Sequence, residues 1–243
     1  HILREGPFKN VWIQPASGDA GGSLGVALAI DHLMGGARRK SNAADRDAMR
    51  GCYLGPAFSP PRIHADLDEF GAVYADLDDE VLFDLVAGHL AEGRVVGWFQ
   101  GRMEFGPRAL GNRSIIADPR STEMQRLLNL KIKYRESFRP FAPAVLQEDA
   151  AKYFELAEDS PYMLLVAQVQ PPHLRQLSQK DSALTGLGAL GVVRSDIPAI
   201  THVDCSARIQ TVHADTNPRF HRLLRAFKDR TGCGVLVNTS FNV

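Results

Sequence analysis

The fold of this chain is most constrained by the alternation of short apolar runs with segments of helical periodicity between residues 81 and 243. Apolar residues recur at helical spacing over residues 81–90, and the strand-like run RVVGWFQ follows. Farther along, Asn217 and Pro218 predict the N-cap and first turn of a helix that ends at Gly232, before the apolar run GVLVNTSF. Alternation of this kind predicts an α/β domain.

The remaining apolar runs predict further strands, with one more helix among them. The predicted strands are NVWIQ (10–14), SIIAD (114–118), FAPAVL (141–146), MLLVAQVQ (163–170), AITHVD (199–204) and SARIQTV (206–212). A helix is expected from about Ser121 to Lys133, with Lys131 and Lys133 near its C-terminal end, where the helix dipole favours cations. Residues 171–196 lack clear periodicity, so we expect a long surface excursion or an active-site cover.

A break in this pattern separates the N-terminal part from the rest. RRKSNAADRD is polar, and GPAFSPPRI is rich in proline and glycine. We therefore expect a linker or domain boundary between Gly35 and Asp79, with its SPP portion extended. The sequence opens on His1 rather than methionine and stops at Val243 directly after a predicted strand, so we expect a fragment of a longer protein.

Composition argues against several functional classes. The 243 residues carry 28 Lys and Arg against 28 Asp and Glu, and this neutral balance argues against a general nucleic-acid binder. The 3 cysteines lack CxxC spacing, so neither a disulfide framework nor a cysteine zinc site is supported. No apolar run approaches the ~20 residues of a membrane-spanning helix, and the N-terminus lacks a signal-peptide pattern. We expect a cytoplasmic protein without a membrane partner.

The neutral chain nevertheless concentrates positive charge within residues 97–146. The cations there include Arg102, Arg108, Arg113, Arg120, Lys131, Lys133, Arg135 and Arg139. Such a run is often a solvated basic face. Here the glycines and the proline of GRMEFGPRALGN favour a folded loop, and guanidinium forks with lysine point charges are suited to phosphate or carboxylate.

A glycine-rich turn that runs into a helix, PASGDAGGSLGVALAIDHLM (15–34), follows the first predicted strand. It would place Gly21 and Gly22 at a helix N-terminus, where backbone N–H groups bind phosphate, with Asp19 at the tip of the turn. The alternative is an ordinary strand-to-helix turn whose glycines only permit close packing. The residues alone leave both interpretations open.

Two more stretches contain the residue types of an anion site. They contribute Thr201, His202, Asp204 and Arg208, and then Asn238, Thr239 and Ser240. Hydroxyl and amide groups can complete the hydrogen-bond shell of an anion that arginines orient. Transfer of a phosphoryl or acyl-phosphate group needs such positioning more than it needs a protein nucleophile. Ser240 lacks a GxSxG elbow, and a GxxxxGK[ST] loop is absent from the sequence, which separates this pattern from a hydrolase triad and from a P-loop.

Several ordered segments resemble a known family. They are GRMEFGPRALGNRSI with KIKYRESFRPFAP, THVD followed by SARIQTV, NPRFHRLLRAFKDRTG, and VLVNTSFN. Over about residues 81–243 they resemble the C-terminal YrdC-like domain of the O-carbamoyltransferases that modify antibiotics and nodulation factors. NVWIQPASGDAGGSLGVALA is similar to the end of the preceding actin-like (ASKHA) α/β domain. The implied fold is a YrdC-like twisted mixed sheet with flanking helices.

The resemblance also implies an activity and a domain division. In this family the YrdC-like domain makes carbamoyl-adenylate from carbamoyl phosphate and ATP, usually with Mg²⁺. The carbamoyl group then passes to a hydroxyl of a small-molecule or glycan acceptor at the actin-like domain. The implied division is residues 1–40 as the actin-like remnant, 41–79 as the linker and 80–243 as the adenylate-forming domain.

The motifs of the family carry over to individual residues. The implied catalytic residues are Arg108, Lys133 and Arg139. The implied substrate or nucleotide contacts are Arg208, Ser240, Asn238, Thr201 and, in the glycine-rich turn, Gly21 and Gly22. Asp19 matches an aspartate that, with histidines expected in the preceding part, holds an iron-type divalent metal in the complete actin-like domain.

Two departures and two rival functions stand beside this resemblance. Cys205-Ser206 replaces an expected glycine and threonine, which puts adenine or ribose contacts there in question, and the 171–196 segment is longer than usual. One rival is a YrdC-type adenylate former for tRNA threonylcarbamoylation or hydrogenase maturation, which should carry an acyl-phosphatase or zinc-finger region with paired CxxC motifs that this sequence lacks. The other is a non-catalytic nucleotide- or phosphate-binding module. The acceptor and the oligomeric state stay open.

Overall fold

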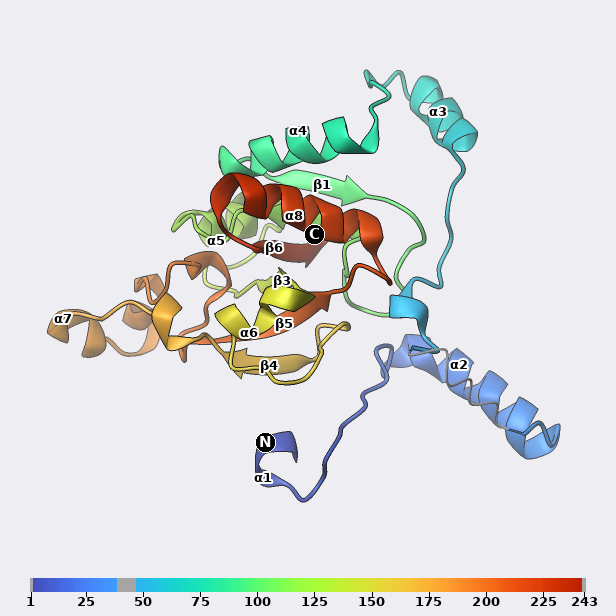
Figure 1. The fold of residues 1–243 in the computed structure, drawn as a ribbon, viewed down its shortest axis with the longest axis horizontal. Helices are drawn as coiled ribbons and strands as arrows, with labels where there is room; N and C mark the ends of the chain where they lie inside the picture. Colours follow the sequence, from blue (N-terminus) through green and yellow to red (C-terminus); the bar gives the residue numbers. More distant parts are fainter. Residues whose placement is uncertain (1, 39–46, 242–243) are drawn as a thin grey trace.

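The computed structural model describes residues 2–38 and 47–241. Six strands of these residues form one sheet: β1 (Val96–Phe99), β2 (Arg113–Ala117), β3 (Ala142–Leu146), β4 (Leu165–Gln168), β5 (Ser206–Val212) and β6 (Val235–Ser240). The strand order is β1-β2-β6-β3-β5-β4, with β3 and β5 parallel and the other neighbours antiparallel (Figure 1). The predicted α/β class with a mixed sheet is confirmed.

Two long helices, α4 (Asp79–Ala91) and α8 (Pro218–Thr231), lie side by side against the sheet (Figure 1). The Asn217 side chain accepts a hydrogen bond from the Phe220 N–H (3.2 Å) as the N-cap of α8. Gly232 follows the helix with φ 76°, a left-handed conformation that suits glycine. The buried face of α8 consists of Phe220, Leu223, Leu224 and Phe227. The predicted caps and apolar face of this helix are confirmed.

Short helices and turns form the connections. Helix α5 (Met124–Leu127) continues as a π-helix over Leu128–Ile132, so Lys131 and Lys133 lie at its C-terminal end as predicted. The other short elements are α6 (Ala150–Tyr153), α7 (Gln179–Ser182) and the 3₁₀ turns Arg50–Cys52, Gln147–Asp149, Pro171–His173, Gly186–Gly191 and Pro198–Ile200. Residues 171–196 contain only such short pieces, in agreement with a long surface excursion.

Two predicted strands are wrong. Residues 10–14 have no regular secondary structure, and Trp12 is 68% exposed, because no strand of the described residues pairs with this segment. Residues 199–204 begin in a 3₁₀ turn opened by Pro198, and the His202 N–H then bonds to the carbonyl of Ser206 (2.9 Å), only four residues farther along, so this segment turns into β5. Short apolar runs occur in irregular segments as well as in strands, so periodicity could not distinguish these two segments from strands.

The N-terminal region is built differently from the sheet region. Helices α1 (Ile2–Glu5), α2 (Asp19–Ala29, continued as a π-helix over Ile30–Met34) and α3 (Pro60–Glu69) lie away from the sheet (Figure 1). Neither α2 nor α3 has a buried residue within the described chain. The prediction that the SPP portion is extended is wrong beyond Ser59, because Pro60 and Pro61 form the first turn of α3, where proline is tolerated. The predicted linker thus contains a helix. Its residues 39–46 lie outside the described residues, and the division into domains stays a prediction.

Two clusters of buried apolar residues hold the described chain together. The larger cluster joins the sheet to α4 and α8 and includes Leu90, Ile116, Leu146 and Phe227. The smaller one joins Met49 and Cys52 to Leu110, Ala142, Tyr162 and Met163. None of the helices in the described ranges is both long and apolar enough to cross a membrane.

Candidate anion-binding site

A cavity of about 510 Å³ lies where the end of β6 meets the start of β3, the middle of β5 and two loops. Its lining residues are Pro107, Arg108, Ala109, Lys133, Tyr134, Arg135, Arg139, Pro140, Phe141, Ala142, Met163, Arg208, Asn238, Thr239 and Ser240. We call it the cation cavity, because five of these side chains are Arg or Lys and none of the described lining residues is acidic. The lining includes six of the residues predicted from the sequence, namely Arg108, Lys133, Arg139, Arg208, Asn238 and Ser240.

The register of the sheet brings polar residues of β5 and β6 to one face. Asn238 pairs with Ala142 on β3, and Ala144, two residues farther along β3, pairs with Gln210 on β5. Because side chains alternate between the two faces of a sheet, Arg208 projects from the same face as Gln210. The Asn238 Nδ2 atom donates a hydrogen bond to Gln210 Oε1 (2.8 Å), which agrees with this register.

The loop that carries Arg108 is held by buried hydrogen bonds. Glu104 is 6% exposed, and its Oε1 atom accepts from the backbone N–H groups of Leu110 (2.7 Å) and Asn112 (2.9 Å). The Leu110 carbonyl accepts from Gln210 Nε2 at 2.8 Å. Buried bonds of this kind restrict the loop to one conformation, so Arg108 is presented from a rigid support.

Two glycines let this loop approach its neighbours closely. Gly111 has φ 102°, and a Cβ atom added there would lie 2.2 Å from the Phe220 ring. Gly106 has φ 127°, and a Cβ atom there would lie 3.2 Å from the Pro15 carbonyl oxygen. Only glycine adopts such backbone conformations without strain. The close approaches therefore explain why the loop has glycine at positions 106 and 111.

The positive charges in the cation cavity are partly removed from water. Burial lowers the pKa of the Arg208 guanidinium, and the positive charge of Arg108 lowers it further. The Nε atoms of both arginines are buried and have no hydrogen-bond partner among the described residues. Like charges and unused donors held together away from water are unfavourable, and a bound anion would relieve both.

Lys133 and Ser240 form one corner of the cavity. Lys133 is 6% exposed, and its Nζ atom donates to the Ser240 carbonyl oxygen (2.6 Å) and lies 3.3 Å from Ser240 Oγ. Burial lowers the pKa of Lys133, and the charge of Arg135 adds to this effect. The next residue, Tyr134, has φ 46°, a conformation that residues with side chains adopt rarely and that is enriched at ligand sites.

Arg139 and Arg135 differ in how they are held. The Arg139 side chain is 53% exposed, and its Nε atom lies 2.8 Å from Glu136 Oε2. Arg135 donates from Nε to Asn129 Oδ1 (2.6 Å), and its guanidinium lies 4.8 Å from the centre of the Phe141 ring. Burial lowers the Arg135 pKa, and the charge of Arg139 lowers it further. Sequence reasoning left Arg135 out of the site, and only its spacing of two residues from Lys133 could have suggested it.

Thr201 lies outside the cation cavity. It lines a neighbouring cavity of about 740 Å³, with residues that include Arg126, Phe138, Pro140 and His202. Pro140 belongs to both linings, so the two cavities adjoin at this residue. The Thr201 hydroxyl donates to the Ile197 carbonyl oxygen (2.9 Å) and lies 2.7 Å from Ser195 Oγ. Thr201 therefore does not line the cation cavity, and its contact with a ligand stays a prediction.

The residues predicted on α2 also lie outside both linings. A Cβ atom added at Gly21 would lie 2.0 Å from the Ala16 carbonyl oxygen, which favours the close-packing interpretation of this glycine, whereas Gly22 faces open space. Asp19 is exposed in the first turn of α2. The described part of the chain contains no group of three or more His, Cys, Asp or Glu residues that could hold a metal ion. The described residues therefore do not form an iron-type site by themselves, and the role of Asp19 stays a prediction.

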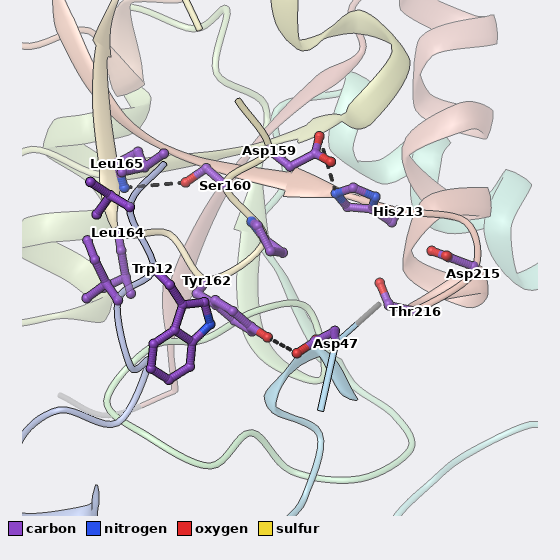
Figure 2. A pocket seen from close by; sticks show the side chains of 13 residues that line it. Trp12, Asp47, Asp159, Ser160, Tyr162, Leu164, Leu165, His213, Asp215 and Thr216 are labelled. Atoms are coloured by element: carbon purple, nitrogen blue, oxygen red, sulfur yellow. Dashed lines mark hydrogen bonds and ion pairs between the residues drawn. The ribbon is translucent and has the colours of Figure 1, made fainter. Parts of the chain in front are cut away.

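A second pocket, of about 280 Å³, lies between residues 11–13, the segment 159–165 and the turn at 213–216 (Figure 2). Its lining contains the carboxylates of Asp47, Asp159 and Asp215, and none of the described lining residues is Lys or Arg. We therefore call it the acidic pocket. Its apolar wall consists of Val11, Trp12, Ile13, Pro161, Tyr162, Leu164 and Leu165. Sequence reasoning missed this pocket, because its walls come from distant segments that share no motif.

Comparison with known proteins places the chain among carbamoyltransferases. A family model described as Carbamoyltransferase C-terminus matches residues 87–243. The chain is 40% identical over 247 residues to nodulation protein NolO of Bradyrhizobium diazoefficiens, covering 99% of the chain and 40% of that protein. It is 38% identical over 237 residues to the 3'-hydroxymethylcephem-O-carbamoyltransferase of Amycolatopsis lactamdurans, covering 98% of the chain and 38% of that protein. The chain is also 37% identical over 240 residues to the protein of the same name from Streptomyces clavuligerus, covering 98% of the chain and 38% of that protein. The chain thus spans about 40% of the length of these relatives.

Proposed function

Because the chain belongs to the carbamoyltransferase family, we propose that it is the carbamoyl-adenylate-forming part of an ATP-dependent O-carbamoyltransferase. The observation that supports this most directly is the cation cavity, which gathers four arginines and Lys133 without an acidic residue in its described lining. Acyl phosphates and nucleotide phosphates are the anions that arginine forks and a lysine point charge bind best. The unpartnered Nε atoms of Arg108 and Arg208 leave donors available for such a ligand.

In the proposed reaction, water first releases phosphate from carbamoyl phosphate. An oxygen of the resulting carbamate then attacks the α-phosphorus of ATP, the bond to pyrophosphate breaks, and carbamoyl-adenylate forms. Arg108, Arg208 and Lys133 hold the phosphate oxygens and balance the charge that builds up on the leaving group. Positioning and charge stabilisation carry this chemistry, so no protein nucleophile is required.

The nucleoside of ATP is assigned to the neighbouring cavity. That cavity adjoins the cation cavity at Pro140, and its volume of about 740 Å³ lies in the usual range of small-molecule pockets. Mg²⁺, when bound, would neutralise the pyrophosphate charge. Its binding is assigned mainly to the nucleotide phosphates themselves, since the described residues offer no cluster of candidate metal ligands.

Transfer of the carbamoyl group to an acceptor is a separate part of the proposal. The acceptor class is a hydroxyl-bearing small molecule or glycan, in keeping with the hydroxymethyl group in the name of the cephem relatives. The chain covers less than half of these relatives, so we assign the transfer step to the longer protein.

The test is pyrophosphate release from ATP by the 243-residue chain, with and without carbamoyl phosphate. We expect release only when carbamoyl phosphate is present, and loss of release in Arg208→Ala. ATP binding without carbamoyl-dependent release would contradict the proposal and support the non-catalytic nucleotide-binding module. Asp159→Asn in the acidic pocket is the matched control and should release pyrophosphate as the unmodified chain does.

A further inference from the structure

A segment of the predicted linker, residues 52–56, lies against the loop that carries Arg108. Backbone hydrogen bonds join this segment to the start of the loop. They run from the N–H groups of Phe105, Gly55 and Met103 to the carbonyl oxygens of Cys52 (2.7 Å), Met103 (2.9 Å) and Pro56 (2.9 Å), in that order. Cys52 and Leu110 also belong to the same buried apolar cluster. The linker segment 52–56 is therefore part of the support of the cation cavity.

The Tyr53 side chain joins the same segment to the far side of the loop. Its hydroxyl donates to the Leu110 carbonyl oxygen (2.8 Å) and accepts from Asn217 Nδ2 (2.9 Å). The direction of these bonds follows from the cap of α8, because Asn217 Oδ1 accepts from the Phe220 N–H and its Nδ2 can only donate. The Tyr53 proton is thus left for Leu110. Burial raises the pKa of the Tyr53 hydroxyl, so the group stays protonated and keeps this bond.

Arg108 has to be held in place, because it lies close to a second positive charge. Burial lowers the pKa of Arg208, and the charge of Arg108 lowers it further. The Nε atoms of both arginines are buried and lack a hydrogen-bond partner in the described part of the chain. Before an anion binds, repulsion and unused donors therefore favour a movement of Arg108 toward water.

The hydrogen bonds of the linker segment oppose this movement. They hold the loop on both sides of Arg108, at residues 103–105 through the backbone and at Leu110 through Tyr53. A loop that is already ordered loses less conformational freedom when a ligand binds, so the affinity for that ligand is higher. Tyr53 is not among the described lining residues of the cation cavity, so any effect on a ligand must pass through the loop.

We propose that Tyr53 is a positioning residue, which keeps Arg108 beside Arg208 and so raises the affinity of the cation cavity for anions. This inference rests on the proposed function, because it takes the cation cavity to be the anion site. It extends that site to the predicted linker, which the sequence motifs of the site do not include.

The test is a double-mutant cycle, measured by calorimetric titration of the 243-residue chain with sulfate. Tyr53→Phe removes the hydroxyl and keeps the ring, and it should weaken sulfate binding by about three- to tenfold. In the Arg108→Ala protein the same change should have less than about a twofold effect, because the loop then presents no guanidinium. In the Arg139→Ala protein it should keep its full effect. A general loss of structure would weaken binding in both backgrounds alike.

Tyr74→Phe is the matched control, because it removes a hydroxyl from another part of the predicted linker. The Tyr74 hydroxyl donates to Asp68 Oδ1 (3.0 Å) at the exposed surface, and sulfate affinity should not change without it. Amide hydrogen exchange in the unmodified chain is a second measurement. Residues 104–112 should already exchange slowly without sulfate, and added sulfate should slow them little further. This measurement tests the proposal even if the Tyr53→Phe protein does not fold.

The outcomes distinguish the role of Tyr53 from the proposed function. If Arg108→Ala weakens sulfate binding but a folded Tyr53→Phe protein binds normally, the role of Tyr53 is overturned and the proposed function stands. An equal effect of Tyr53→Phe with and without Arg108 would overturn that role as well. So would slow exchange of residues 104–112 that appears only after sulfate is added, because the anion would then order the loop. If Arg108→Ala leaves sulfate binding unchanged, the cation cavity is not the anion site and both proposals fail.

Discussion

The cation cavity and the acidic pocket lie on either side of one loop and are built in opposite ways. Tyr162 lines the acidic pocket and Met163 the cation cavity. The cation cavity stands on paired strands and a loop with buried hydrogen bonds, whereas the acidic pocket takes one wall from residues 11–13, which have no regular secondary structure. The two regions therefore differ in the secondary structure that supports them as well as in charge.

The two regions also differ in how their polar groups are satisfied. In the acidic pocket, Asp47 accepts from the Tyr162 hydroxyl and from the Gly51 N–H (2.6 Å), so this carboxylate serves the local structure (Figure 2). In the cation cavity, the buried Nε atoms of Arg108 and Arg208 have no partner among the described residues. A buried polar group without a partner needs an explanation, and a ligand is the most direct one. The comparison indicates that unmet hydrogen bonds, more than pocket shape, identify the candidate site.

The largest expected effect concerns the rigid support of the cation cavity. Gly111→Ala should lower the free energy of unfolding by about 3 kcal/mol, because the new Cβ atom meets the Phe220 ring at a backbone conformation that disfavours side chains. Gly22→Ala on α2 is the matched control, since a Cβ atom there meets no atom within 4 Å. Urea denaturation measures both, and equal stability of the two variants would contradict the rigid-loop description.

The second largest effect tests whether anion binding depends on the charge of the cation cavity and not on that of the acidic pocket. Arg208→Ala should weaken sulfate binding by about 2 kcal/mol, because a partly buried, charged donor is lost. Asp159→Asn in the acidic pocket should leave sulfate affinity nearly unchanged. Calorimetry with sulfate measures both variants. A similar loss in each would mean that sulfate responds to the overall charge of the protein rather than to the cation cavity.

A smaller effect is expected from pH. Burial lowers the pKa of Lys133 from its ordinary value of 10.5, so its positive charge is present at lower pH and is lost as pH rises through the lowered pKa. Sulfate keeps its charge over this range, and its affinity should fall by about tenfold as Lys133 becomes neutral. Lys133→Arg keeps the charge and should flatten the profile. An unchanged profile in that variant would remove Lys133 from the list of anion contacts.

The smallest effect is expected at the rim of the cation cavity. The Arg139 side chain is 53% exposed and already pairs with Glu136, so water and this carboxylate screen its charge. Arg139→Ala should weaken sulfate binding only by about two- to fivefold. Titration at low and high salt measures this, and the difference from the unmodified chain should shrink at high salt. A loss as large as that of Arg208→Ala would show that Arg139 moves inward when an anion binds.

Local signals in the sequence were enough to identify most elements of the sheet region. The N-cap Asn217, the terminal Gly232 and the apolar face between them predicted α8, since each acts within a few residues. The same reasoning failed for residues 10–14 and 199–204. A strand exists only when another strand pairs with it, and pairing depends on residues far away in the sequence.

The sequence by itself determined the charge, the turns and most secondary structure of residues 97–146, together with the family resemblance. Only the tertiary structure decided which cations of that stretch meet. Arg120 pairs with Asp118 (2.6 Å), and Arg102 bonds to the Gly55 carbonyl oxygen (3.0 Å). The cations that remain at the cavity are Arg108, Lys133, Arg135 and Arg139, joined by Arg208 from β5. Local chemistry fixes the conformation of each segment, but the pairing of β3, β5 and β6 brings the segments together.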